Sequence, residues 1–446
     1  MSPQPFGNPS RTLSRREFVR WGAAGLALTA AAACIPGSAG SGASGGGGEP
    51  KNLNVGQWGT AQRADLYKQA LALFQQQNTG VNTNLQFADL ASYNDRLTTQ
   101  AASKSLPDVL WMRDDRISQY GGTGALLDLS PYLGKGIETS KLSANAPADG
   151  KVGSGVFALP SHYVGQSVII NATIFQDRGI KYDQQVKTWD DLAALARELS
   201  NPGQKLWGIN DPTLGTTQRH LQAWIRQAGQ ELFTPDGNIG FTADVFGSWL
   251  DFWDKLRKDQ VIPPADVETQ ADAGGMATNP IVTNQTPIVL ASSNGLTQVQ
   301  RLTKTPLAMF SIPEIPNASR DWWFFPPILL SIGANTRSPQ LSVSLLDFFL
   351  NSVPAGKITR VDQGAPSSVP VRDALLPDLA SDEAGFVNQI SREMTYPARA
   401  LPVLPAASGA VITAQAEAGQ QVAYGRQSVP QAVDAFMSAA RKALGK

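Results

Sequence analysis

The chain has 446 residues, with 37 lysines and arginines against 37 aspartates and glutamates. That length allows two or three domains, and the even charge balance argues against a nucleic-acid partner held by bulk charge. The single cysteine, Cys34, excludes an internal disulfide, and with only His162 and His220 there is no Cys/His cluster with metal spacing, so we expect no metal or other cofactor.

The N-terminal segment is basic and leads into a short apolar run. Arg15 and Arg16 form a twin-arginine pair, and residues 21–33 are rich in alanine and glycine. This run is too short for a permanent membrane span, which needs about 20 apolar residues. Residues 1–33 therefore resemble a bacterial twin-arginine signal peptide, the kind that exports proteins already folded.

The segment around Cys34 indicates a membrane anchor. Ala31-Ala32-Ala33-Cys34 resembles a lipobox, in which the cysteine is lipidated. Ala31 stands where leucine is usual, so ordinary signal cleavage remains an alternative. Residues 37–48, nearly all glycine, serine and alanine, form a flexible tether. We expect residues 34–50 to be a lipidated linker that holds the protein on the outer face of the cytoplasmic membrane.

The next segments alternate between strand and helix patterns. Strands are predicted at residues 53–58, 81–87 and 108–112, and helices at 61–77 and 93–102. Such alternation predicts an α/β fold with a doubly wound sheet.

The third of these strands ends in four charged residues. Val109 to Met112 are apolar in succession, which is typical of a strand covered on both faces. Arg113, Asp114, Asp115 and Arg116 follow at the carboxyl end, where ligands bind in open α/β sheets. The alternative is a solvated turn whose charges pair with one another. Trp58 ends the first strand, so the same rule places it near the cleft. The alternative is that Trp58 is a core residue.

Further elements follow along the chain. A strand is predicted at 166–171, and a helix at 188–199 has Thr188 as its N-cap. Other helices are predicted at 219–228, 243–258, 341–351 and 429–444, a strand at 287–294, and an aromatic cluster at 321–325.

Several short motifs share an order with one known family. They are Leu106-Pro-Asp-Val-Leu, Asp149-Gly-Lys before Ala158-Leu-Pro160, and Thr188-Trp-Asp-Asp-Leu. In order and spacing the chain resembles the family 1 extracellular solute-binding proteins, the maltose-binding-like subunits of ABC importers.

The resemblance implies a periplasmic-binding-protein-like fold of type II, with two doubly wound α/β lobes joined by a hinge. It places the first lobe at 51–160 with 331–375 and the second at 161–330 with 376–446. It further implies a monomer that closes around a small solute and delivers it to ABC permease subunits without catalysis.

The resemblance also suggests where a ligand lies. Asp115 and Arg116 match an Asp-Arg pair of the maltose type, with Asp114 as a neighbour. Tyr163 follows the first hinge crossing. Other candidate contacts are Trp58, Gln218, Arg219 and Asn294. Many sugar binders carry a stacking tryptophan near the position of Asn294, which this chain lacks, so Trp322 or Trp323 is expected to take its place.

Carboxylates and arginines bind sugar hydroxyls, and aromatic rings stack on sugar faces, so we expect a carbohydrate ligand. A sensor for another polar solute is the alternative. A glycosidase needs two carboxylates about 5–10 Å apart, and the adjacent Asp114 and Asp115 do not provide them.

Overall fold

The computed structural model describes residues 51–446, except residues 144–145, 216–218, 274 and 403. The expected export signal with Arg15 and Arg16, the linker with Cys34, and the candidate contact Gln218 lie outside the described residues. Within the described part of the chain, every helix is too short or too polar to cross a membrane.

The first sheet has six strands in the order β11-β6-β10-β3-β1-β2. The early strands pair in parallel, and the later ones join the same sheet antiparallel. The strands are β1 (Asn52–Trp58), β2 (Asn82–Ala88), β3 (Val109–Arg113), β6 (Ala158–Tyr163), β10 (Pro327–Ile332) and β11 (Ala365–Pro366). Helices α1 (Ala61–Gln77) and α2 (Leu90–Ala102) connect the first three, which confirms the predicted alternation.

Strand β3 is the buried centre of this sheet. β1 and β10 pair on its two sides, and Val109 to Met112 are each at most 1% exposed. The ring of Trp111 meets the rings of Tyr67 and Phe349 edge-on, at centroid distances of 4.9 and 4.7 Å. The unbroken apolar run is explained because both faces of the strand are covered.

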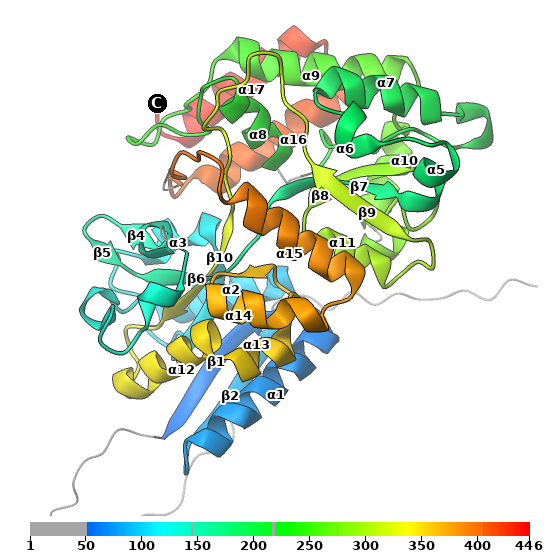
Figure 1. The fold of residues 1–446 in the computed structure, drawn as a ribbon. Helices are drawn as coiled ribbons and strands as arrows, with labels where there is room; N and C mark the ends of the chain where they lie inside the picture. Colours follow the sequence, from blue (N-terminus) through cyan, green and yellow to red (C-terminus); the bar gives the residue numbers. More distant parts are fainter. Residues whose placement is uncertain (1–50, 144–145, 216–218, 274, 403) are drawn as a thin grey trace, which may run out of the picture. The chain divides into compact units, whose positions relative to one another are not determined.

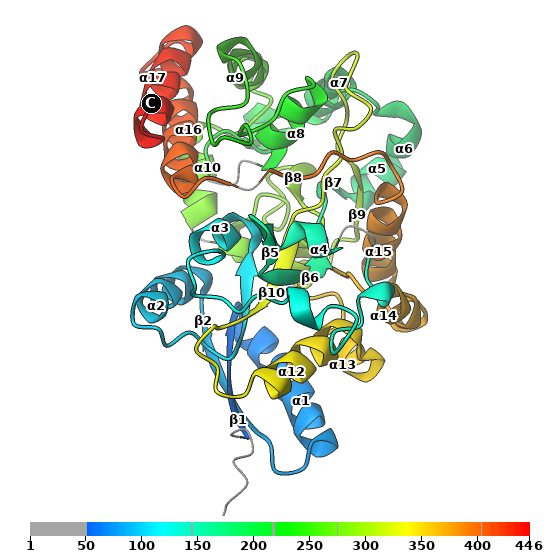
Figure 2. The same ribbon diagram turned by 90° about the vertical axis from the view of Figure 1, so that its left-hand side faces the viewer.

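The second sheet is smaller and antiparallel around its middle strand. β7 (Gln166–Asn171) lies between β8 (Ile288–Ser292) and β9 (Leu307–Ser311). The helices grouped with this sheet in Figures 1 and 2 are α7 (Trp189–Leu199), α8 (Arg219–Gln227), α9 (Ala243–Lys258), α16 (Ser408–Ala423) and α17 (Val429–Ala443). Four buried tryptophans, Trp189, Trp224, Trp249 and Trp253, pack at centroid distances of 5.5–6.3 Å in its core.

The remaining elements are short or late in the chain. They are α3 (Ile117–Tyr120), α4 (Ala146–Asp149), β4 (Lys151–Val152), β5 (Gly155–Val156), α5 (Ala172–Asp177), α6 (Tyr182–Gln185), α10 (Ala265–Ala273), α11 (Gly295–Gln300), α12 (Pro339–Asn351), α13 (Val353–Thr359), α14 (Val369–Leu375) and α15 (Ser381–Glu393).

The chain passes between the sheets more than once. β6 of the first sheet ends at Tyr163, and β7 of the second begins at Gln166. The return runs from β9 in the second sheet to β10 in the first. The predicted limits of the two lobes, 51–160 with 331–375 for the first and 161–330 with 376–446 for the second, stay a prediction.

Helix α7 has the N-cap that its sequence predicts. The Thr188 hydroxyl accepts a hydrogen bond from Asp191 N at 3.1 Å, and the Asp191 carboxylate accepts one from Thr188 N at 2.8 Å. Replacing Thr188 by alanine should therefore lower the free energy of unfolding by about 1 kcal/mol. Thr188→Ser keeps the hydroxyl, so its free energy of unfolding, measured with urea, should fall by only a small fraction of that amount. An equal loss in both variants would contradict the capping role.

Candidate ligand-binding site

A cavity of about 690 Å³ lies between the elements of the two sheets. Strands β1 and β3 are parallel and end at it with Trp58 and Arg113, as the carboxyl-end rule for α/β sheets requires. The second sheet contributes Gln166 at the start of β7 and Ser292 at the end of β8. The other polar lining residues are Thr60, Gln62, Arg63, Asp114, Arg219, Asn294, Gln298, Arg301, Asp362 and Gln363. Its volume is that of a small-molecule site.

An ion pair crosses from one side of this cavity to the other. Arg219 Nη2 lies 2.6 and 2.8 Å from the two carboxylate oxygens of Asp114. Asp114 follows β3, whereas Arg219 begins α8 beside the second sheet. The two side chains are only 14% and 9% exposed. Gln222 holds the other terminal nitrogen of Arg219 at 3.0 Å, so the guanidinium is fixed in position.

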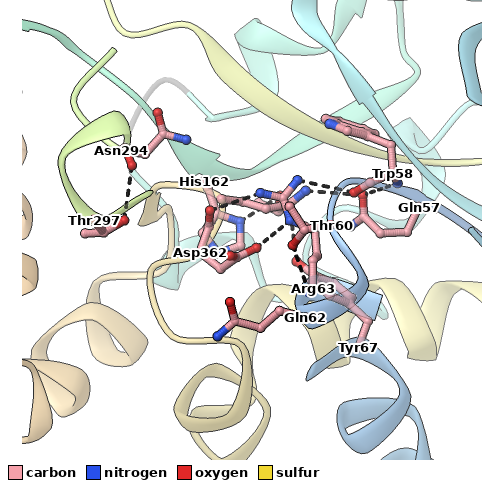
Figure 3. Close-up of polar contacts among 12 residues, drawn as sticks. Gln57, Trp58, Thr60, Gln62, Arg63, Tyr67, His162, Asn294, Thr297 and Asp362 are labelled. Atoms are coloured by element: carbon pink, nitrogen blue, oxygen red, sulfur yellow. Dashed lines mark hydrogen bonds and ion pairs between the residues drawn. The ribbon is translucent and has the colours of Figure 1, made fainter. Parts of the chain in front are cut away.

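A second pair, Arg63 with Asp362, also lines the cavity (Figure 3). Arg63 Nη1 also donates to Trp58 O at 3.2 Å, and Nη2 to Asp362 O at 3.1 Å. Tyr67 donates to Gln363, the residue after Asp362, and the amide nitrogen of Gln363 donates to Gln57. These bonds tie the start of α1 to the loop before β11.

The buried His162 lies close to this network (Figure 3). Burial, together with the charge of Arg63, lowers its pKa to about 3. Its Nδ1 lies 3.0 Å from Ser161 Oγ. The imidazole is therefore neutral at physiological pH and adds no charge beside the cavity.

The structure brings four of the candidate residues together around the cavity and places others elsewhere. Trp58, Asp114, Arg219 and Asn294 line it. Asp115 instead pairs with Arg113 at 3.1 Å, and Arg116 donates to Gln119 at 3.2 Å.

Tyr163 is buried and is not among the residues that line the cavity, and its hydroxyl donates to Asp149 at 2.6 Å. Burial raises the pKa of that Asp149 carboxyl to about 6 despite the hydrogen bond.

The two adjacent tryptophans lie apart from this cavity. Trp322 is 2% exposed and donates to Glu314 at 2.8 Å. Trp323 stacks on it at 4.1 Å and contacts Tyr396. Trp323 lines a different cavity of about 730 Å³, beside β9.

Several lining residues were missed from the sequence. Arg63 and Asp362 are 299 positions apart, so no local pattern joins them. A local signal did exist for Gln298 and Arg301, which follow the predicted Asn294 at a spacing of four and three residues that places all three on one side of a helix. In the part of the chain that the structure describes, no group of three or more His, Cys, Asp or Glu side chains could hold a metal.

Comparison with known proteins gives one family and one fold. The family model for bacterial extracellular solute-binding proteins matches residues 60–353. A family 1 extracellular solute-binding protein from Alicyclobacillus acidocaldarius is 26% identical, with a TM-score of 0.70 over 89% of this chain and 98% of that one.

Two further solved structures carry a sugar ligand. The oligogalacturonide-binding protein of Yersinia enterocolitica, in complex with saturated digalacturonic acid, is 19% identical, with a TM-score of 0.75 over 88% of this chain and 98% of that one. An ABC substrate-binding protein from Listeria monocytogenes, in complex with cycloalternan, is 18% identical, with a TM-score of 0.75 over 88% and 99%. These likenesses confirm the predicted fold class of two α/β lobes joined by a hinge.

Proposed function

Because the chain belongs to the bacterial extracellular solute-binding proteins of ABC importers, we propose that it captures a carbohydrate in the cavity between its sheets and delivers it to a permease. The observation that carries this proposal is the make-up of the cavity. Charged and amide side chains from both sheets converge on a space of about 690 Å³ that Trp58 also lines.

The chemistry of the lining suits sugar hydroxyls and sugar faces. Guanidinium groups donate hydrogen bonds to hydroxyl oxygens, carboxylates accept them from hydroxyls, and amides do both. Trp58 gives an apolar surface for the carbon face of a ring. The sugar complexes of the Yersinia and Listeria proteins, which share the fold, support a ligand of this kind.

The proposal extends to location. The twin-arginine pair at Arg15 and Arg16 supports export, and the lipobox-like sequence before Cys34 supports lipidation. The glycine-rich linker would then let the binding lobes reach a permease from their anchor. The protein acts by binding and release, with closure of the lobes about the hinge.

A thermal-shift screen of the full-length chain in mild detergent tests this function. A sugar bound only by the folded protein, at 100 times its dissociation constant, should stabilise it by about 2.7 kcal/mol and raise its melting temperature. X-ray scattering should then show a smaller radius of gyration with that sugar. If peptides or metals raised the melting temperature and no sugar did, the carbohydrate proposal would be wrong.

A pair of variants tests whether the ligand binds in this cavity. Trp58→Ala should weaken sugar binding about tenfold, the effect of losing roughly 1.4 kcal/mol of contact. Trp323→Ala removes an aromatic ring from the other cavity and should leave the affinity within twofold. If titration calorimetry shows that both variants lose sugar affinity equally, the ligand does not bind in this cavity.

A further inference from the structure

Helix α11 presents a polar face to the cavity. Asn294 caps its start, Gln298 lies one turn further, and Arg301 ends it. All three side chains line the cavity. The spacing of four and three residues brings them to one side of the helix, so they form a continuous row along one cavity wall.

Close hydrogen-bond partners are missing along this row. Within the described residues, the side-chain amides of Asn294 and Gln298 have none, although the backbone carbonyl of Asn294 accepts from Thr297 at 3.1 Å (Figure 3). Arg301 makes only long contacts: its Nη1 donates to Gln62 Oε1 at 3.4 Å, and it lies 3.7 Å from Glu383 and 3.8 Å from Asp362. These contacts are longer than the roughly 2.7–2.9 Å that is typical of a strong guanidinium–carboxylate hydrogen bond.

The other arginines of the cavity are more tightly engaged. Arg219 lies 2.6 Å from Asp114, Arg113 lies 3.1 Å from Asp115, and Arg63 pairs with Asp362. Among the arginines of the described lining, Arg301 has the most distant carboxylates, Glu383 at 3.7 Å and Asp362 at 3.8 Å. Its side chain is 38% exposed, the most of the four, so a ligand could reach it.

The charge balance of the lining points the same way. The described lining contains four arginines, and three of them have a close carboxylate, from Asp114, Asp115 or Asp362. The carboxylates nearest Arg301, those of Glu383 and Asp362, are more distant and also pair with other arginines. Arg301 is therefore the least compensated positive charge of the lining.

We propose that the ligand is a carbohydrate bearing an anionic group, which Arg301 binds while Asn294 and Gln298 bind neighbouring hydroxyls. This inference rests on the proposed function and narrows its substrate class. The planar guanidinium can donate two parallel hydrogen bonds to a carboxylate, a sulfate or a phosphate. The amides, each a donor and an acceptor, match hydroxyl groups, which are also both.

The test uses the full-length chain and matched sugars. Uronic-acid oligosaccharides, each beside its neutral methyl ester, test a carboxylate, and sugar sulfates and phosphates beside their parent sugars test the other anions. We expect the best anionic ligand to bind at least tenfold more tightly than its neutral partner in titration calorimetry. That preference should shrink as salt is added.

Two variants assign the preference to one residue. Arg301→Gln should weaken binding of the anionic sugar at least tenfold while changing the neutral partner less than twofold. Arg320→Gln makes the same charge change beside the other cavity and should change neither. Melting curves would show that both variants are folded.

The possible failures are distinguishable. If neutral sugars bind as tightly as their anionic partners, or if Arg301→Gln weakens both equally, the anionic ligand is ruled out while carbohydrate binding stands. If no sugar of any charge binds, the carbohydrate function and this inference both fail.

Discussion

Replacing Asp114 by alanine should lower the free energy of unfolding by about 3 kcal/mol and abolish tight solute binding. The carboxylate and its partner Arg219 are 14% and 9% exposed. Removing one member of such a pair leaves the other charge desolvated without compensation, which costs roughly 3–5 kcal/mol when the pair is fully buried. Binding suffers as well because Arg219 is then held by Gln222 alone, and the ion pair that crosses the cavity is lost.

Two further variants make this prediction specific to the buried pair. The double variant Asp114→Ala with Arg219→Met removes both charges and should recover most of the lost stability without restoring binding. Asp65→Ala breaks the exposed pair with Lys68, whose side chains are 68% and 64% exposed, and should change stability by no more than about 0.5 kcal/mol. Denaturant unfolding measures all three. A single Asp114 variant as stable as the parent would contradict the argument.

Replacing Glu393 by glutamine should make the protein more stable at pH 8, by on the order of 3 kcal/mol. Glu393 is 1% exposed on α15 and accepts hydrogen bonds from Ser311 and from Gln389, the latter at 2.8 Å. Its second carboxylate oxygen is buried without a partner among the described residues. Burial raises its pKa from 4.5 to about 7, although both hydrogen bonds and the charge of Arg392 oppose the shift.

The sign of the pH dependence follows from which state keeps the proton. Between about pH 4.5 and 7 the folded protein keeps the proton of Glu393 and the unfolded chain releases it. The contribution of Glu393 to stability is therefore complete below pH 4.5 and is lost as the pH rises. Glutamine resembles the protonated acid, so the two proteins should be about equally stable at pH 4.5 and diverge above it.

For comparison, the exposed Glu138 should give a pH dependence of stability with the opposite sign. Hydrogen bonds from Ser140 lower the pKa of Glu138, so Glu138→Gln should lose stability relative to the parent as the pH rises above the acid range. Denaturant unfolding at pH 4.5, 6 and 8 gives both profiles. A Glu393→Gln profile parallel to that of the parent would show that the carboxyl ionises equally in both states.

Local pattern in the sequence was enough for the elements that surround the site. The apolar run at Val109 to Met112 predicted the buried strand, and Thr188 predicted the start of α7. Both signals are carried by neighbouring residues. The charged residues that follow Met112 also predicted where β3 ends, and therefore the edge of the sheet where a ligand would bind.

The direction of individual side chains was not visible in the same way. A single 3₁₀ turn, Asp114–Arg116, follows β3, and it turns Asp114 into the cavity while Asp115 pairs with Arg113. The sequence does not specify that turn. The adjacent Trp322 and Trp323 lie outside any long strand and stack on each other, so alternation along a strand could not decide where their rings point. Pairs such as Arg63 with Asp362 depend on the tertiary fold alone.

The strand order of the first sheet has a consequence for how the protein is made. β10 lies between β3 and β6, yet it leaves the ribosome only after the whole of the second sheet. Until then β3 lacks one of its two neighbours and β6 lacks both, since β11 is made later still. Unpaired strand edges favour aggregation, and such long-range pairing slows folding. The first sheet is therefore completed only after β10 and β11 have been made. The twin-arginine export proposed from Arg15 and Arg16 would allow such a chain to complete this sheet in the cytoplasm before it crosses the membrane.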